Sequence, residues 1–325
     1  MKSATPFSIC QCGLALFLLS GLPAQAGDRD AARAIRIDYP LDRLTPNVYV
    51  IHGPTEDPTP ANQAFRNNPG IVLTREGVVI IDPGSSVHVG SMVVRKVQTL
   101  TNKPIVAVFN THAHGDHWLG NEGIKLAYPR AVIYAHPKMK AMALQDEGRM
   151  WIKAFNERSA GAVDGTTPVG PDKVANDGDV VTIGGTRFRV LHPGPAHSDH
   201  DLMIELPDEK VLFFGDIVRD GLLGPFQASF KGNIAAIDRG LKTEATVFVP
   251  GHGRSGDRTA AVNYRRFLET MRVQVRLGYR NGLSDFEMKP KVAAALGDYR
   301  NWSALNESLG QLVSAAYLEI ETEEF

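Results

Sequence analysis

The sequence predicts an α/β protein with four αββα layers, in which two mixed sheets pack face to face and helices cover their outer sides. Short apolar runs rich in β-branched residues, bounded by glycine and proline, fall into two groups and predict the strands. Segments with apolar residues at helical spacing accompany both groups. Because a sheet buries each apolar face against another layer, two such groups favour a sandwich between helices.

The predicted strands of the first group cover residues 47–51, 70–73, 78–81, 105–109 and 131–135. Those of the second group cover 180–183, 186–191, 202–206, 211–214 and 246–249. Predicted helices cover 91–100, 136–155, 234–241, 259–277 and the tail from 286 to 318. The segment 53–70 is rich in turn residues and predicts a surface loop with Phe65 exposed, or a flap beside a site.

The N-terminus has the features of a secretory signal peptide. Lys2 is followed by a short apolar run at 14–22, and small residues precede a cleavage site after Ala26. Cys10 and Cys12 both lie within this segment, so a mature chain has no cysteine for catalysis, metal binding or disulfides. We expect a periplasmic or secreted protein with no membrane attachment after cleavage.

Composition and charge describe an ordinary globular chain. The 325 residues are 43% hydrophobic and carry a formal net charge of −1, with lysine and arginine scattered along the chain. Nothing resembles the basic footprint of a nucleic-acid-binding protein, so a small-molecule substrate is expected. We expect a main domain at 27–282 and a C-terminal helical extension at 283–325; the sequence leaves the oligomeric state open.

A dense cluster of metal-binding side chains follows the predicted strand 105–109. His112, His114, Asp116 and His117 lie within six positions. As core residues they would be buried polar groups without partners, so a metal site is favoured. On an extended backbone, residues two apart face the same side, which predicts that the first three of these side chains point together.

Three further metal-binding residues follow turns or strands downstream. His197 follows a Gly-Pro turn, Asp216 follows the predicted strand 211–214, and His252 follows 246–249. A single motif cannot supply ligands for two tetrahedral sites, so ligands from other strand ends are needed. Since no cysteine is available, these sites must be built from histidine and carboxylate.

The order H-x-H-x-D-H, H, G-D and P-G-H-G resembles the metallo-β-lactamase superfamily over residues 47–257. The resemblance implies a metallo-β-lactamase-type sandwich with two metal ions, expected to be zinc, although iron or manganese stay open. One ion would be held by His112, His114 and His197. The other would be held by Asp116, His117 and His252. Asp216 would bridge the two ions together with a water or hydroxide.

This arrangement implies hydrolysis by metal-activated water. Two adjacent dications lower the pKa of bound water, and one of them polarises the substrate carbonyl. Asp116 is the expected catalytic residue, which orients the nucleophile and transfers a proton to the leaving group. Asp82 either supports a ligand imidazole from behind or begins a turn before Pro83 and Gly84.

The complete ligand set is similar to that of glyoxalase II-type thioesterases, lactonases and exported hydrolases associated with quinoprotein dehydrogenases. An ester, thioester or lactone is therefore the expected substrate. A β-lactamase is the alternative, because Arg219 and Asn233 stand where such enzymes place substrate contacts. His200 either reaches substrate or lies in a surface loop. An iron-dependent oxidoreductase similar to persulfide dioxygenases, and a non-catalytic metal-binding protein, also remain open.

Overall fold

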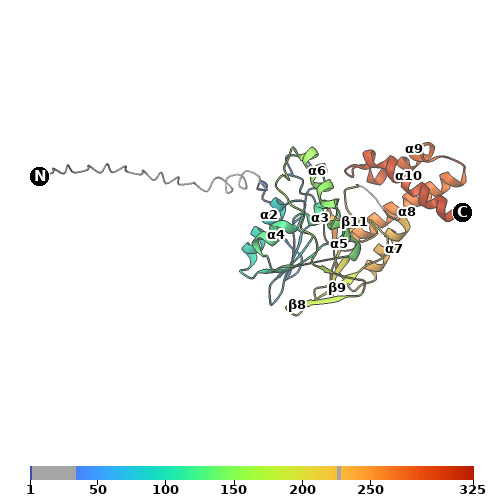
Figure 1. The fold of residues 1–325 in the computed structure, drawn as a ribbon. Coiled ribbons are helices and arrows are strands. Elements are labelled where there is room, and N and C mark those ends of the chain that lie inside the picture. The colour runs from blue at the N-terminus through green and yellow to red at the C-terminus, as the bar shows by residue number, and fades with distance from the viewer. Residues whose placement is uncertain (2–33, 225–227) are drawn as a thin grey trace. The chain divides into compact units, whose positions relative to one another are not determined.

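Two sheets form the centre of the fold (Figure 1). The computed structural model describes residues 1, 34–224 and 228–325, so the predicted signal peptide lies outside the described residues except for Met1. The residues from 34 onward belong to one compact unit. None of the helices in the described ranges is long and apolar enough to cross a membrane.

The first sheet has seven strands in sequence order, antiparallel from β1 to β4 and parallel from β4 to β7. These strands are β1 (Asp42–Arg43), β2 (Val48–Val50), β3 (Gly70–Leu73), β4 (Val78–Ile81), β5 (Ile105–Phe109), β6 (Val132–Ala135) and β7 (Lys173–Val174). The second sheet has the order β12-β11-β10-β9-β8, in which only β11 and β12 are parallel. Its strands are β8 (Val180–Ile183), β9 (Thr186–Leu191), β10 (Met203–Leu206), β11 (Val211–Arg219) and β12 (Val247–His252).

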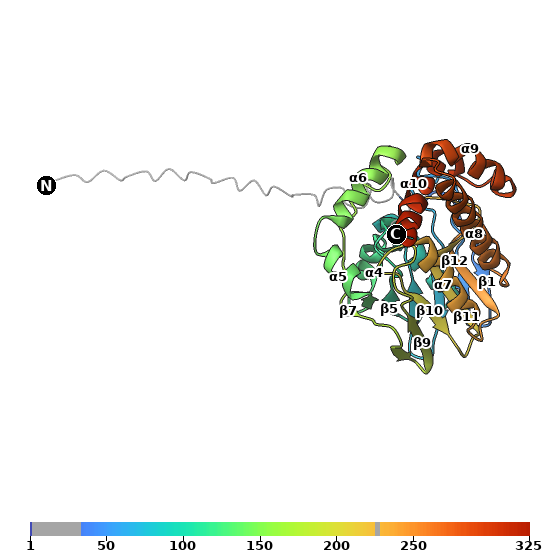
Figure 2. The same cartoon turned by 90° about the vertical axis from the view of Figure 1, so that its right-hand side faces the viewer.

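Helices cover the outer face of each sheet, as Figures 1 and 2 show. The first sheet is covered by α2 (Val87–Leu100) and α4 (Asn121–Ala127). The second is covered by α7 (Phe230–Leu241) and α8 (Thr259–Arg280), and α9 (Asp285–Ala295) and α10 (Leu305–Glu324) pack on α8. Three short helices, α3 (Gly115–Trp118), α5 (Pro137–Ala143) and α6 (Glu147–Ser159), lie between strands β5 and β7. The four predicted layers are therefore present.

Alternating side chains divide the apolar core into layers. In β4, Val79 and Ile81 face the second sheet, whereas Ile80 packs against the layer of α2. In β5, Phe109 lies between the sheets and stacks on Phe188 of β9, with ring centroids 5.4 Å apart. Successive side chains of a strand point to opposite faces, so strands buried on both sides are apolar throughout.

Several details differ from the sequence-based expectations. Strand β11 continues to Arg219, beyond the predicted end at residue 214. The helix predicted for 136–155 is two helices, α5 and α6, separated by a turn at 144–146. Phe65 is fully buried against Tyr39 rather than exposed, so the segment 53–70 packs on the domain. The strands β1 and β7 and the helices α3 and α4 were not predicted, because they are short and carry little apolar periodicity.

Contacts at both ends of α10 hold it against the loop after β11 and against α8. Ahead of the helix, Ser303 accepts the backbone N–H of Leu223 and donates its own to Gly221, each at 2.9 Å. Near its end, Glu319 and Glu323 pair with Arg272 of α8, whose side chain is only 10% exposed. These contacts position α10 beside the loop that follows β11.

The buried ion pairs of Arg272 predict a large stability effect. Arg272→Ala leaves Glu319 without its cation and removes one of the cations that pair with Glu323, and we expect the free energy of unfolding to fall by about 3 kcal/mol. Urea denaturation measures this change. Arg187→Ala breaks an exposed pair with Asp208 and is the matched control, expected to unfold at the wild-type midpoint. Equal midpoints for all three proteins would contradict the prediction.

Candidate metal centre

The ends of strands β5, β9, β11 and β12 and the segments next to them bring the seven predicted ligands to one place. The loop after β5 carries His112 and His114 and continues into α3, and the loop between β9 and β10 carries His197. Asp216 lies within β11 and His252 ends β12. All seven side chains are buried, and they form two groups of potential metal ligands that lie side by side.

The first group contains His112, His114, His197 and Asp216. Its histidines meet at close range, since His197 Nε2 lies 3.1 Å from His114 Nδ1. Asp216 Oδ2 faces the group at 3.6 Å from His197 Nε2 and 4.0 Å from His112 Nε2. His112 Nε2 is buried and has no hydrogen-bond partner among the described residues, as expected for a nitrogen directed at an ion.

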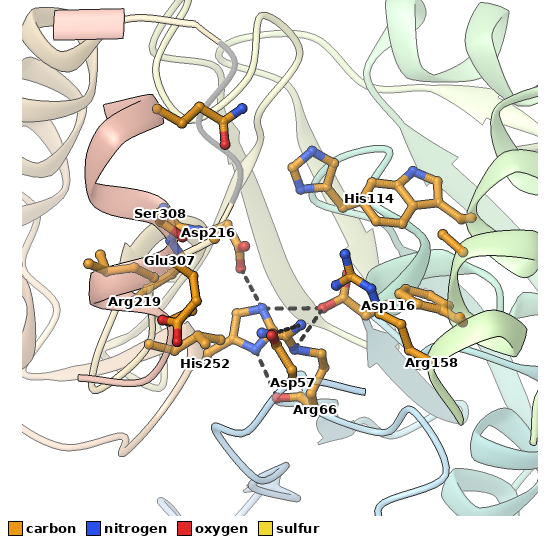
Figure 3. Close-up of a pocket in the computed structure, with 18 residues that line it drawn as sticks. Asp57, Arg66, His114, Asp116, Arg158, Asp216, Arg219, His252, Glu307 and Ser308 are labelled. Atoms are coloured by element: carbon orange, nitrogen blue, oxygen red, sulfur yellow. Dashed lines mark hydrogen bonds and ion pairs between the residues drawn. The ribbon is translucent and has the colours of Figure 1, made fainter. Parts of the chain in front are cut away.

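The second group contains Asp116, His117 and His252, and the other oxygen of Asp216 completes it. His117 Nε2 and His252 Nε2 are 3.4 Å apart, and each lies 3.2 Å from Asp216 Oδ1. Asp116 Oδ2 lies 3.4 Å from the His252 nitrogen and 3.8 Å from that of His117. Figure 3 shows Asp116 and Asp216 on either side of His252.

These spacings fit divalent metal ions of the size of zinc. Two donors that bind one tetrahedral ion at about 2.0–2.1 Å are roughly 3.3 Å from each other. The donor separations in the second group cluster around that value, and those in the first group range from 3.1 to 4.0 Å. The two groups therefore fit a dinuclear metal site, and one oxygen of Asp216 faces each group.

Hydrogen bonds behind His112, His117 and His252 select the tautomer that presents Nε2 to the site. The Nδ1–H of His117 donates to Asp82 Oδ2 at 2.8 Å. Thr111 Oγ1 donates to the same oxygen at 2.6 Å and accepts from His112 Nδ1–H at 3.0 Å. His252 Nδ1–H donates to the backbone carbonyl of Arg66 at 2.8 Å. Such outer partners orient ligand imidazoles and raise their basicity.

Asp82 therefore lies behind the ligand histidines. This position agrees with its predicted role of supporting a ligand imidazole. Its Oδ1 accepts the backbone N–H of Thr111 at 2.8 Å, so the carboxylate holds both the loop after β5 and His117. The backbone of Asp82 adopts a positive φ of 53°, and its carbonyl accepts Asn67 Nδ2 at 2.8 Å. A left-handed aspartate at a strand end is strained, and these contacts maintain that conformation.

Burial and charge prepare the side chains to bind cations. Burial holds the pKa of His112 and that of His197 well below the ordinary histidine value, which keeps both rings neutral. Burial also opposes a charge on His117, but the carboxylates of Asp216, Asp116 and Asp82 outweigh it and hold its pKa well above that value. The second group thus strongly attracts positive charge.

The one-turn helix α3 explains how adjacent residues serve different groups. The extended backbone expected across His112, His114 and Asp116 does not persist, because α3 begins at Gly115 with His114 as its N-cap. The helical turn sends Asp116 and His117 to the second group and leaves the first two histidines in the other. The predicted common direction of all three side chains is therefore wrong for Asp116.

A cavity of about 250 Å³ opens beside the two groups. Its floor includes His114, Asp116, Asp216 and His252 (Figure 3). One wall is a face of α6, and the other combines the loop after β11 with the first turns of α10. Gly251 lies behind the floor, where a side chain would collide with Asp216 Oδ1. Because glycine has no side chain, β12 can approach the carboxylate of Asp216 closely at this position.

The structure places the three predicted substrate contacts differently. Arg219 lines the cavity but is 2% exposed and donates to the Tyr264 hydroxyl at 2.9 Å. Asn233 lies in α7, is buried, donates to the backbone carbonyl of Ile217 at 2.9 Å and is not among the residues that line the cavity.

His200 is also buried rather than in a surface loop. Its Nε2 accepts the backbone N–H of Ala113 at 3.1 Å, and its Nδ1–H donates to Asp199 at 2.8 Å. Burial lowers the pKa of His200, which favours the neutral ring that can accept this bond. His200 therefore braces the loop between His112 and His114.

Part of the cavity wall was not predicted from the sequence. Arg66 lies in the segment 53–70 with its Nε 4.0 Å from Asp116 Oδ2, and no motif marked it. Trp151, Phe155 and Arg158 share the spacing of one helical face of α6, which is a signal visible in the sequence but common to most amphipathic helices. The residues of α10 that line the cavity carry no sequence pattern that marks them as part of a site.

Curated relatives cover part of this chain. A hydroxyacylglutathione hydrolase of Francisella tularensis subsp. novicida is 25% identical over 168 residues, which are 51% of this chain and 53% of that protein. An acyl-coenzyme A thioesterase of Bos taurus is 29% identical over 46% of this chain and 56% of its own. A linear primary-alkylsulfatase of a Pseudomonas species is 26% identical over 55% and 40%. The chain spans about half the length of the curated relatives it matches.

Solved structures share the fold at low sequence identity. A metallo-β-lactamase from Pontibacter korlensis superposes with a TM-score of 0.56 at 24% identity and covers 71% of this chain and 99% of its own. The sec-alkylsulfatase Pisa1 from a Pseudomonas species superposes with a TM-score of 0.69 at 20% identity over 86% and 50%. A family model described as the metallo-beta-lactamase superfamily matches residues 63–252, which contain every residue of the two groups, and the chain therefore belongs to this superfamily.

Proposed function

We propose that this protein is an exported hydrolase that holds two zinc ions and cleaves an ester, thioester or lactone. The observation that carries the proposal is the donor spacing of the two ligand groups, which share the carboxylate of Asp216. The complete second group supports two ions over the mononuclear iron site of the oxidoreductase alternative. Export is supported by the signal-peptide features of residues 1–26.

Bound in this site, a pair of divalent ions supplies a Lewis acid and a hydroxide at neutral pH. The role of Asp116 follows from its position at the cavity floor, where its side chain is 10% exposed. Burial opposes its charge, but His117, His252 and Arg66 outweigh it and lower the pKa of Asp116. The ionised carboxylate orients the nucleophilic hydroxide, accepts its remaining proton during the attack and delivers that proton to the leaving group.

Thioester chemistry is supported by one relative that is named as an acyl-coenzyme A thioesterase, and acyl-group hydrolysis by another that is named as a hydroxyacylglutathione hydrolase. The β-lactamase alternative relied on Arg219 and Asn233. The amide of Asn233 donates to the Ile217 carbonyl, and the guanidinium of Arg219 is almost fully enclosed beside Tyr264. We therefore favour an acyl ester or thioester over a β-lactam.

A substrate panel on zinc-loaded mature protein tests the function. We expect two zinc ions per chain by elemental analysis. Thioesters or lactones should be hydrolysed with a higher kcat/KM than cephalosporins and phosphodiesters. Removal of the ions with a chelator should abolish turnover and lower the melting temperature, and added zinc should restore both. A protein that takes up no transition metal, or one that prefers cephalosporins, would contradict the proposal.

Asp116→Asn tests the proton-transfer role. The amide preserves the shape of the side chain but cannot accept the proton, so kcat should fall by about 10²- to 10⁴-fold with the fold intact. Turnover, circular dichroism and zinc content should be measured together, because a lost ion would also lower kcat. Near-normal turnover with two ions bound would remove Asp116 from the mechanism.

Asp82→Ala tests the support behind His117. Without the acceptor for Nδ1–H, the ring is free to rotate, and we expect the affinity of the second ligand group for zinc to fall about 10- to 100-fold. Titration against a fluorescent zinc chelator measures this. Asp38→Ala is the control, because Asp38 is exposed and, among residues 34–224 and 228–325, pairs with Lys96 alone. Equal zinc affinity in both variants would show that Asp82 does not support the site.

A further inference from the structure

An unneutralised guanidinium reaches into the cavity beside the ligand groups. Arg158 lies in the last turn of α6 and extends its side chain toward the cavity floor near Asp116 (Figure 3). It is exposed, and within the described ranges no hydrogen bond or ion pair reaches its guanidinium. A fixed cation without a protein partner at the mouth of a cavity attracts an anionic ligand.

The other charged residues of the cavity are already engaged or face away from this position. Arg66 pairs with Asp57 at 3.3 Å and lies 4.0 Å from Asp116. Arg219 is almost fully enclosed and donates to Tyr264. Asp116 and Asp216 belong to the ligand groups, so bound metal ions would offset their negative charge.

The opposite wall repels an anion. Glu307 of α10 lines the cavity across from α6 (Figure 3). It is exposed, and no cation within the described residues pairs with it. With a carboxylate on one wall and Arg158 on the other, an anionic group is directed to the α6 side.

The same face of α6 is apolar between Arg158 and the metal ligands. Trp151 packs beside His114 with ring centroids 5.0 Å apart, and Phe155 follows at 5.4 Å from Trp151. Ala154 also lines the cavity. Residues 151, 154, 155 and 158 have the i, i+3, i+4, i+7 spacing of one helical face, so the apolar surface leads directly to the guanidinium.

We propose that the cavity selects substrates in which an apolar segment carries an anionic group such as a carboxylate. Trp151 and Phe155 contact the apolar segment, and Arg158, rather than Arg219, contacts the anion. This inference rests on the proposed hydrolase function and specifies the class of its substrate. Arg158 is thus a specificity-determining residue that acts outside the metal centre.

Two matched thiophenyl esters test the proposal, one with an acyl chain that ends in a carboxylate and one with a chain that ends in a carboxamide. In Arg158→Ala we expect KM for the carboxylate ester to rise about tenfold or more, with kcat unchanged. KM for the carboxamide ester should not change. Arg158→Lys retains the positive charge and should keep part of the preference.

Lys153→Ala provides the matched control. Lys153 is a cation of the same helix, its side chain is 80% exposed, it pairs with Glu157, and it does not line the cavity. Wild-type kinetics are expected for this variant on both esters. An equal rise of KM for both esters in Arg158→Ala, or no rise for either, would overturn the proposal. The same would follow if Arg219→Gln, and not Arg158→Ala, lost the preference for the carboxylate.

A binding measurement separates this inference from the hydrolase proposal. If the zinc-loaded wild type cleaves neither ester, the proposed reaction fails, and 4-phenylbutanoate and 4-phenylbutanamide are then titrated by isothermal calorimetry. Tighter binding of the carboxylate by wild type, lost in Arg158→Ala and kept in Lys153→Ala, supports the anion contact. Equal affinity for both compounds in wild type, or a preference that survives in Arg158→Ala, overturns it.

Discussion

The carboxylate of Asp216 is the contact on which the rest of the site depends. One oxygen lies 3.2 Å from the ligand nitrogens of His117 and His252, and the other faces the remaining histidines. Its position requires β11 to continue beyond the predicted strand end and to pair with β12, where Gly251 leaves room for it. Because so many buried ligand atoms are costly without a cation, we expect metal binding to stabilise this region of the fold.

Most of the fold was predictable from the sequence because its strands are buried. The run at Val78–Ile81 is apolar at every position, since each side of β4 packs against another layer. The two-residue strands β1 and β7 are exposed and give no comparable signal. The break between α5 and α6 was missed because the apolar spacing continues across the turn at 144–146. Local pattern thus identified the layers but not every boundary.

The ligands were predictable from residue type, whereas the walls of the cavity depend on tertiary contacts. Clustered histidines and aspartates at strand ends predict metal ligands, because few other roles suit these side chains there. The burial of His200 and the turning of Asn233 toward Ile217 follow from packing between distant segments. Arg66 is placed by a segment whose Phe65 enters the core, and no local pattern distinguishes that from an exposed loop.

The backbone pairing of Ser303 with Gly221 and Leu223 places α10 beside the cavity without using any of the metal ligands. The sheets supply the reactive centre, and the last helix, docked through this short backbone pairing and the Arg272 cluster, supplies one side of its entrance. Residues such as Ser308 and Gln311 are therefore free to vary without disturbing any donor atom. Substitutions in the C-terminal helix can therefore change which substrates enter, while the metal ligands and the reaction stay the same.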